Sequence, residues 1–243
     1  MKLTGAVTLF TLAALPMAAT AQESNWEGEA ELGVLVTTGN TEETNLKGRL
    51  ALKEDGERWR NLIELRSAYT EAEDETTAER YRGEAETNLK FSDNSFFFLR
   101  GSYEDDRFSG YDFRSSATAG YGHRVWQLDE LSFLDLSAGT GYRYNRLAEP
   151  DEDGERHEEE VIGRLAGHLD FALSENSLFR QKLSTEFGFE NTNTITESET
   201  SVQASVVGDL SLKIAYRVTH VSDPPQDSEN TDTETSVSIL YGF

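Results

Sequence analysis

The sequence predicts an all-β protein, a single antiparallel up-and-down transmembrane β-barrel of about 12 strands. Three observations indicate this fold. Apolar and polar residues alternate with a period of two over almost the whole chain after its first segment. Tight turns alternate with longer loops, and the final strand ends on an aromatic residue, Phe243. Short turns on one side and longer loops on the other are typical of membrane barrels.

The beginning of the chain has the pattern of a secretory signal peptide. Lys2 precedes an apolar run over residues 3–18, and Ala19-Thr20-Ala21 matches the small-x-small pattern of a cleavage site. The run is short and contains a proline, which disfavours a transmembrane anchor. We therefore expect residues 1–21 to be removed on export and residues 22–243 to form an outer-membrane β-barrel domain.

Composition limits the chemistry that the protein can perform. The chain has no cysteine, which excludes disulfides, zinc-thiolate sites, iron–sulfur clusters and cysteine nucleophiles. The formal net charge is −23. Such a surface repels nucleic acid and attracts divalent cations, so we expect no nucleic-acid partner. An acidic surface also favours solubility, and the charge alone assigns no partner.

The first four strands are separated by two turns and one acidic loop. The chain turns at 37–41 and at Asp55-Gly56, a common hairpin dipeptide, and the acidic loop covers 71–77. The fourth strand alternates most cleanly. Every second residue from Tyr81 to Phe91 is apolar, glycine or threonine, and the residues between them are polar. The expected strands are 26–36, 44–53, 58–69 and 80–91.

The next four strands carry longer apolar stripes. Tight turns are expected at 92–94 and 127–130, and longer loops at 105–112 and 148–158. The last of these loops is strongly acidic. The expected strands are 96–104, 113–126, 131–145 and 159–173.

The last four strands lead to the end of the chain. Turns at 174–177 and Gly208-Asp209 alternate with a polar loop after the ninth strand and a loop over 222–232. Every second residue from Thr235 to Phe243 falls on one face. A terminal aromatic in this register resembles the closing strand of bacterial outer-membrane barrels, where it is read by the barrel assembly machinery. The expected strands are 178–190, 196–207, 212–220 and 233–243.

Two features indicate that the apolar face points outward to lipid. Aromatic residues gather at both ends of the strands, as in a membrane with two interfaces, and all three tryptophans fall at the tight-turn end. In the mature chain, lysines and arginines fall on the polar face, except Arg107, Arg146 and Arg156, which we expect in loops. The lumen should then be narrow and ion-paired. Lipid also requires the sheet to close, with 233–243 beside 26–36.

Two candidate sites contain clustered ionisable residues. His168 and Asp170 lie two apart on one face, as a base and its orienting carboxylate could, although a salt-linked pair is the simpler interpretation. The acidic stretches 71–75 and 149–160 could bind Ca²⁺ or Mg²⁺. Neither has the spacing of a dedicated calcium loop, so a solvated acidic rim is the alternative.

His220 and Ser222 form the one arrangement that suggests catalysis. By the alternation, both fall on the apolar face at the loop end of the eleventh strand. A nucleophilic serine there could attack a lipid ester. The outer-membrane phospholipase, also a twelve-stranded barrel, has a similar His-x-Ser pair. Asp223-Pro224-Pro225 departs from the Asn-Gly that follows it there, and no asparagine can be assigned to orient the histidine. We therefore predict no catalytic residue, no cofactor and no metal site.

Several motifs together resemble the YdiY-like family of salt-induced outer-membrane proteins, a domain of unknown function. They are 38–41 (TGNT), 106–114 (DRFSGYDFR), 139–143 (GTGYR) and 222–225 (SDPP), which leads to 231–237 (TDTETSV). The resemblance spans nearly all of the mature chain. It implies an outer-membrane location and an association with salt or osmotic stress, and it implies no substrate.

The sequence therefore predicts a non-enzymatic outer-membrane protein, either structural or a narrow pore for ions or small solutes, linked to salt or osmotic adaptation of the envelope. Its expected partners are outer-membrane lipids and lipopolysaccharide, the assembly machinery through Phe243, and divalent cations at the acidic loops. Two alternatives remain open. One is a lipid hydrolase using His220 and Ser222, and the other is a soluble periplasmic ligand-binding barrel with its apolar face inside.

Cell fractionation tests the choice between membrane and soluble barrels. We expect the protein in the membrane fraction, with an unheated sample migrating differently from a heated one on a gel, because a folded barrel resists unfolding by detergent. Recovery from the periplasm without detergent would instead support the soluble alternative.

Overall fold

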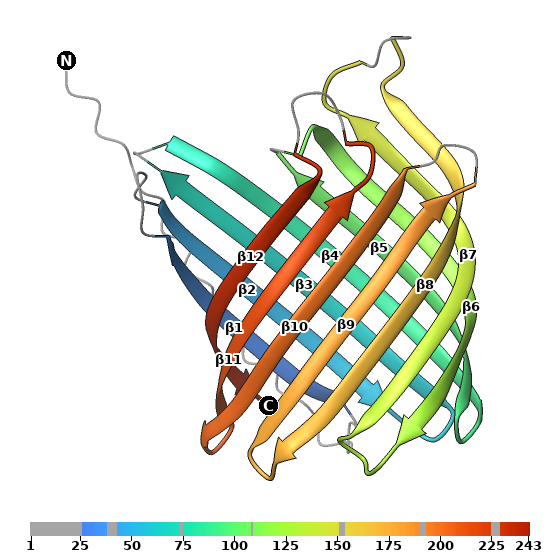
Figure 1. The fold of residues 1–243 in the computed structure, drawn as a ribbon, viewed down its shortest axis with the longest axis vertical. Coiled ribbons are helices and arrows are strands. Elements are labelled where there is room, and N and C mark those ends of the chain that lie inside the picture. The colour runs from blue at the N-terminus through green and yellow to red at the C-terminus, as the bar shows by residue number, and fades with distance from the viewer. Residues whose placement is uncertain are drawn as a thin grey trace, which may run out of the picture.

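The computed structural model describes residues 26–37, 43–72, 75–107, 109–150, 154–189, 193–224 and 229–243. The predicted signal peptide, residues 1–21, lies outside the described residues. Twelve antiparallel strands follow one another around a single closed barrel, and the first pairs with the last (Figure 1). The strands are β1 (Trp26–Thr37), β2 (Glu43–Asp55), β3 (Trp59–Ala72), β4 (Glu75–Ser92), β5 (Ser95–Asp106), β6 (Tyr111–Gln127), β7 (Phe133–Leu147), β8 (His157–Ser174), β9 (Ser177–Gly188), β10 (Thr194–Val207), β11 (Leu210–Val221) and β12 (Thr231–Gly242). The predicted fold class and strand number are confirmed.

Most strand ends agree with the alternation of the sequence, and three differ. The predicted acidic loop 71–77 is largely strand, because β3 continues to Ala72 and β4 begins at Glu75. Arg58 lies in the turn before β3. Arg146, predicted in a loop, lies in β7, where its guanidinium pairs with Asp112 at 3.1 Å.

The seam between β1 and β12 closes the barrel. Backbone hydrogen bonds join Gly28 N to Phe243 O at 2.7 Å and Phe243 N to Gly28 O at 2.9 Å, and the register then runs from Glu29 opposite Gly242 to Val34 opposite Val237. The Phe243 ring packs against Gly28, where a Cβ atom would lie 2.2 Å from the ring. A glycine on the facing strand therefore leaves room for the terminal ring in this position.

Apolar side chains cover the outside of the barrel and charged side chains line its interior. Leu32 and Ile239 are 68% and 57% exposed, whereas Arg100 and Lys213 are 4% and 6% exposed. All three tryptophans are exposed at the tight-turn end, which is at the bottom in Figure 1. A soluble barrel would have the opposite arrangement. The protein is therefore a transmembrane β-barrel. No helix long and apolar enough to cross a membrane occurs among the described residues.

Two phenylalanines are exceptions to the charged interior. Phe96 and Phe98 on β5 point inward and are 8% and 4% exposed. Their rings fit over glycines on the next two strands: an added Cβ at Gly122 on β6 would lie 2.2 Å from Phe96, and one at Gly139 on β7 would lie 2.7 Å from Phe98. This part of the lumen is filled by aromatic packing.

Glycine substitutions test the tightness of the wall. Gly141→Ala would place its Cβ 2.0 Å from the backbone oxygen of Ala117, which cannot move without disturbing the sheet. We expect the free energy of unfolding to fall by about 1–3 kcal/mol, as for other overpacked sites. Gly101→Ala is the matched control, since a Cβ there meets nothing within 4 Å. Urea unfolding in detergent micelles measures both, and equal effects would contradict this packing.

Candidate functional site

The charged lumen is the candidate functional site. A first set of ion pairs joins neighbouring strands of the wall. The register places Asp170 opposite Arg180 and Asp135 opposite Arg124. Each pair is bidentate: Arg180 Nε and Nη2 both lie 2.7 Å from Asp170 oxygens, and Arg124 Nε and Nη2 lie 2.7 and 2.8 Å from Asp135 oxygens. Paired forks of this kind hold both side chains against the wall.

A second set of ion pairs crosses the lumen. Arg82 on β4 reaches Glu197 on β10, with Nη2 2.9 Å from Oε2. These two strands lie on opposite sides of the ring. Arg66 on β3 likewise donates to Glu199 on β10 at 2.9 Å. These contacts tie the two walls together and narrow the lumen between them.

Glu199 is a highly connected carboxylate of the lumen. Besides Arg66, it accepts hydrogen bonds from Arg217 at 2.6 Å and from Lys213 at 3.3 Å. Lys213 also lies 3.2 Å from Glu31. Three cations from two strands, Arg66 on β3 and Lys213 and Arg217 on β11, therefore meet at one glutamate that is 8% exposed. An isolated charge would be costly at such a position, and the surrounding charges compensate it.

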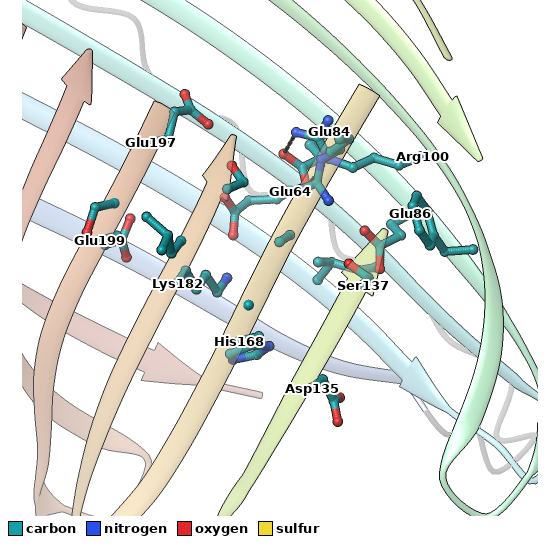
Figure 2. A pocket seen from close by; sticks show the side chains of 18 of the residues that line it. Glu64, Glu84, Glu86, Arg100, Asp135, Ser137, His168, Lys182, Glu197 and Glu199 are labelled. Carbon is teal, nitrogen blue, oxygen red and sulfur yellow. Dashed lines mark hydrogen bonds and ion pairs between the residues drawn. The ribbon is translucent and has the colours of Figure 1, made fainter. Parts of the chain in front are cut away.

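Cavities remain on both sides of the crossing pairs. One, of about 180 Å³, lies in the middle of the barrel and is shown in Figure 2. A second, of about 270 Å³, lies toward the ends that carry the longer loops. Arg82, Glu197 and Arg217 line both cavities. The lumen therefore contains at least two cavities, each large enough for several waters, with the Arg82–Glu197 pair between them.

His168 and Asp170 are in contact, as the sequence predicted. His168 Nε2 lies 2.9 Å from Asp170 Oδ1. Asp170 also holds Arg180, and the His168 ring packs edge-on against Phe133 at 5.4 Å between centroids. The geometry is that of a salt-linked wall cluster, the simpler of the two interpretations.

A family model described as a protein of unknown function, DUF481, matches residues 30–243. The chain belongs to the DUF481 family. This DUF481 barrel is 28% identical over 219 residues to the uncharacterized protein YdiY of Escherichia coli K12, covering 90% of this chain and 83% of YdiY. The resemblance to the YdiY-like family is confirmed.

One solved structure supports the fold of this DUF481 protein. The translocator domain of autotransporter NalP from Neisseria meningitidis superposes with a TM-score of 0.50 at 12% identity, covering 92% of this chain and 90% of that domain. The NanC porin gives 0.48 at 15% identity, covering 88% and 97%. At these identities, the NalP likeness concerns the fold alone.

His220 and Ser222 lie at the loop end of β11, as predicted, and both are exposed. His220 Nδ1 lies 2.8 Å from Thr231 Oγ1 on β12. Ser222, one residue beyond β11, accepts a hydrogen bond at 2.8 Å from the backbone N–H of Thr194. Each side chain thus contacts a different neighbouring strand of the DUF481 barrel.

The acidic stretches are only partly described. The side chains of 71–75 lie outside the described residues, as do 151–153 within 149–160. In the remainder, Glu158 accepts a hydrogen bond from Asn145 at 3.2 Å, Glu159 accepts one from Tyr142 at 2.5 Å, and Glu160 pairs with Arg143. Within the described part of the chain, no group of three or more acidic or histidine side chains is arranged to hold a metal ion.

The crossing pairs were not predicted from the sequence. Arg82 and Glu197 are 115 residues apart, and their contact depends on the barrel radius and on side-chain conformations. The one signal available was that the alternation places both side chains on the inward face of their strands.

Removing one partner of a buried pair tests how far these charges depend on each other. Arg143 and Glu160 are 2% and 4% exposed as side chains. Arg143→Ala leaves Glu160 buried without its cation, and we expect unfolding free energy to fall by about 3–5 kcal/mol. Arg146→Ala, which breaks the exposed pair with Asp112, should cost less than about 1 kcal/mol. Urea unfolding in micelles compares them, and a similar small loss in both would contradict the buried pairing.

Proposed function

We propose that this protein is an outer-membrane barrel whose lumen forms a narrow, ion-paired passage for ions and small polar solutes. The observation that supports this most directly is the Arg82–Glu197 pair, which reaches across the barrel with a polar cavity on each side of it. Eight-stranded barrels are filled by their own side chains, and barrels of sixteen to eighteen strands contain open channels. Twelve strands give an interior between these cases.

The crossing pairs would act as a constriction that responds to salt. The Debye length falls from about 8 Å at physiological ionic strength to about 3 Å at 1 M, so attraction between partly hydrated side chains weakens as salt rises. Arg82 and Glu197 are 15% and 27% exposed as side chains, so water and ions reach them. This links the passage to the salt or osmotic adaptation implied by the family resemblance.

The remaining expectations on location and partners belong to this proposal. The apolar exterior would contact outer-membrane lipid and lipopolysaccharide, the signal peptide 1–21 would direct export, and the strand ending at Phe243 would be read by the assembly machinery. Acidic residues between β7 and β8 would meet divalent cations near the headgroups. A hydrolytic role for His220 and Ser222 has less support. The buried ion pairs and polar cavities lie in the lumen, and not at the surface that carries these two residues.

Conductance across a planar bilayer tests the passage. Glu197→Gln removes the carboxylate that pairs with Arg82, so we expect single-channel conductance to rise by about twofold or more, since the constriction sets the barrier to ions. Glu79→Gln is the matched control, because Glu79 pairs with Arg107 outside the lumen at 2.6 Å. It should leave conductance unchanged.

A flat trace for both the wild type and Glu197→Gln would contradict the passage and leave a structural role. A heated and an unheated gel sample of each variant shows that the barrel is folded before it is measured.

A further inference from the structure

The middle cavity has a charge balance unlike that of the whole chain. Its lining includes seven lysine or arginine side chains and six carboxylates, whereas the chain as a whole has a net charge of −23. The cavity therefore holds an excess of cations, and some of them lack a full set of carboxylate partners.

Two cations of this cavity are incompletely paired. Lys182 on β9 lines the cavity and forms no ion pair with any described residue. Arg164 on β8 is 9% exposed, and its one carboxylate contact is Nε to Glu186 Oε1 at 3.6 Å. Its buried Nε has no hydrogen-bond partner. Glu186 is shared with Arg100 at 3.3 Å, so it does not balance Arg164 alone.

Small side chains leave space between these two cations. The register places Ser137 on β7, Ala166 on β8 and Ser184 on β9 side by side. The row on one side of them contains Arg164, and the row on the other contains Lys182. All five residues line the cavity, and Figure 2 shows Ser137, His168 and Lys182 around it.

Five of the six carboxylates around the cavity pair with arginine or lysine, and the sixth, Glu86, is held by an amide. Glu84 accepts hydrogen bonds from Arg100 at 2.7 and 2.9 Å, and Asp135 and Glu199 are held as described above. Glu86 accepts one from the Asn88 amide at 3.0 Å. The groups left to bind a ligand are thus the ammonium of Lys182, the guanidinium of Arg164 and the two serine hydroxyls.

We propose that this part of the lumen is a binding site for a small oxyanion, held between Lys182 and Arg164 with Ser137 and Ser184 as hydrogen-bond donors. Arginine and lysine bind phosphate and carboxylate groups through charge-assisted hydrogen bonds. A water needs about 10–15 Å³ of such space, so 180 Å³ holds an oxyanion and several waters. The site deepens the proposed function by naming the class of solute, and its role in transport rests on that function.

Phosphate titration of the folded barrel tests the site. Isothermal titration calorimetry in detergent micelles, at constant ionic strength, should show saturable binding of inorganic phosphate to the wild type. Lys182→Gln and Arg164→Gln should each weaken it by about tenfold or more, the loss expected for one charge-assisted hydrogen bond. Lys182→Arg should retain binding, because it keeps the charge.

Lys53→Gln is the matched control. Lys53 lies on the inner face of β2 near the tight turns, is 49% exposed as a side chain and is absent from the cavity lining. It should bind phosphate like the wild type. Absence of saturable binding, or equal affinity in the wild type and folded Lys182→Gln, would overturn the site.

The phosphate titration and the conductance measurement can fail independently of each other. A barrel that binds phosphate but conducts no ions keeps the oxyanion site and overturns the passage. A barrel that conducts but binds no phosphate overturns the oxyanion site and keeps the passage.

Discussion

Hydrocarbon offers no hydrogen-bond partner to a peptide group, and the rest of this structure depends on that constraint. An unpaired N–H or C=O group in lipid costs several kcal/mol, so a membrane sheet must close on itself. Here closure is made by β1 and β12, and the Phe243 ring over Gly28 completes the seam. Once the sheet is closed, alternate residues can only face lipid or the lumen.

The lumen follows from the same constraint. Charged side chains cannot face lipid, so they fill the interior, where each needs a partner of opposite charge. Neighbouring strands supply many of these partners, and long arginine and glutamate side chains supply others from the opposite wall. Such buried pairs are weak evidence for net stability. Their effect is to position side chains, and the incompletely paired Lys182 and Arg164 lie at the proposed oxyanion site.

Much of the fold could be predicted because strand periodicity is local. Alternation places Tyr81 outside and Arg82 inside without knowledge of any other strand, and the prediction that the terminal strand pairs with the first is confirmed. Strand ends were less accurate where polar residues continue a strand beyond the membrane, as at Ala72, Glu75 and Arg146. Parity also places Phe96 and Phe98 inward, opposite to Phe97 and Leu99, but it could not predict the glycines on β6 and β7 that leave room for their rings.

The candidate site could be predicted only as a charged interior. Which arginine meets which glutamate depends on ring position, tilt and side-chain reach, and none of these is a property of a single strand. The contact between His168 and Asp170 was predictable because two residues two apart on one strand are neighbours on one face. The middle cavity depends on three small residues on three strands, which become a group only when the register is known.

Spin-label accessibility along β11 tests most directly which face meets lipid. The chain has no cysteine, so single cysteines can be introduced at Ser211, Leu212, Lys213 and Ile214 and labelled in bilayers. We expect labels at Leu212 and Ile214 to be relaxed by oxygen dissolved in lipid, and labels at Ser211 and Lys213 to be shielded from it. The opposite alternation, or no alternation, would contradict an apolar exterior and a charged lumen.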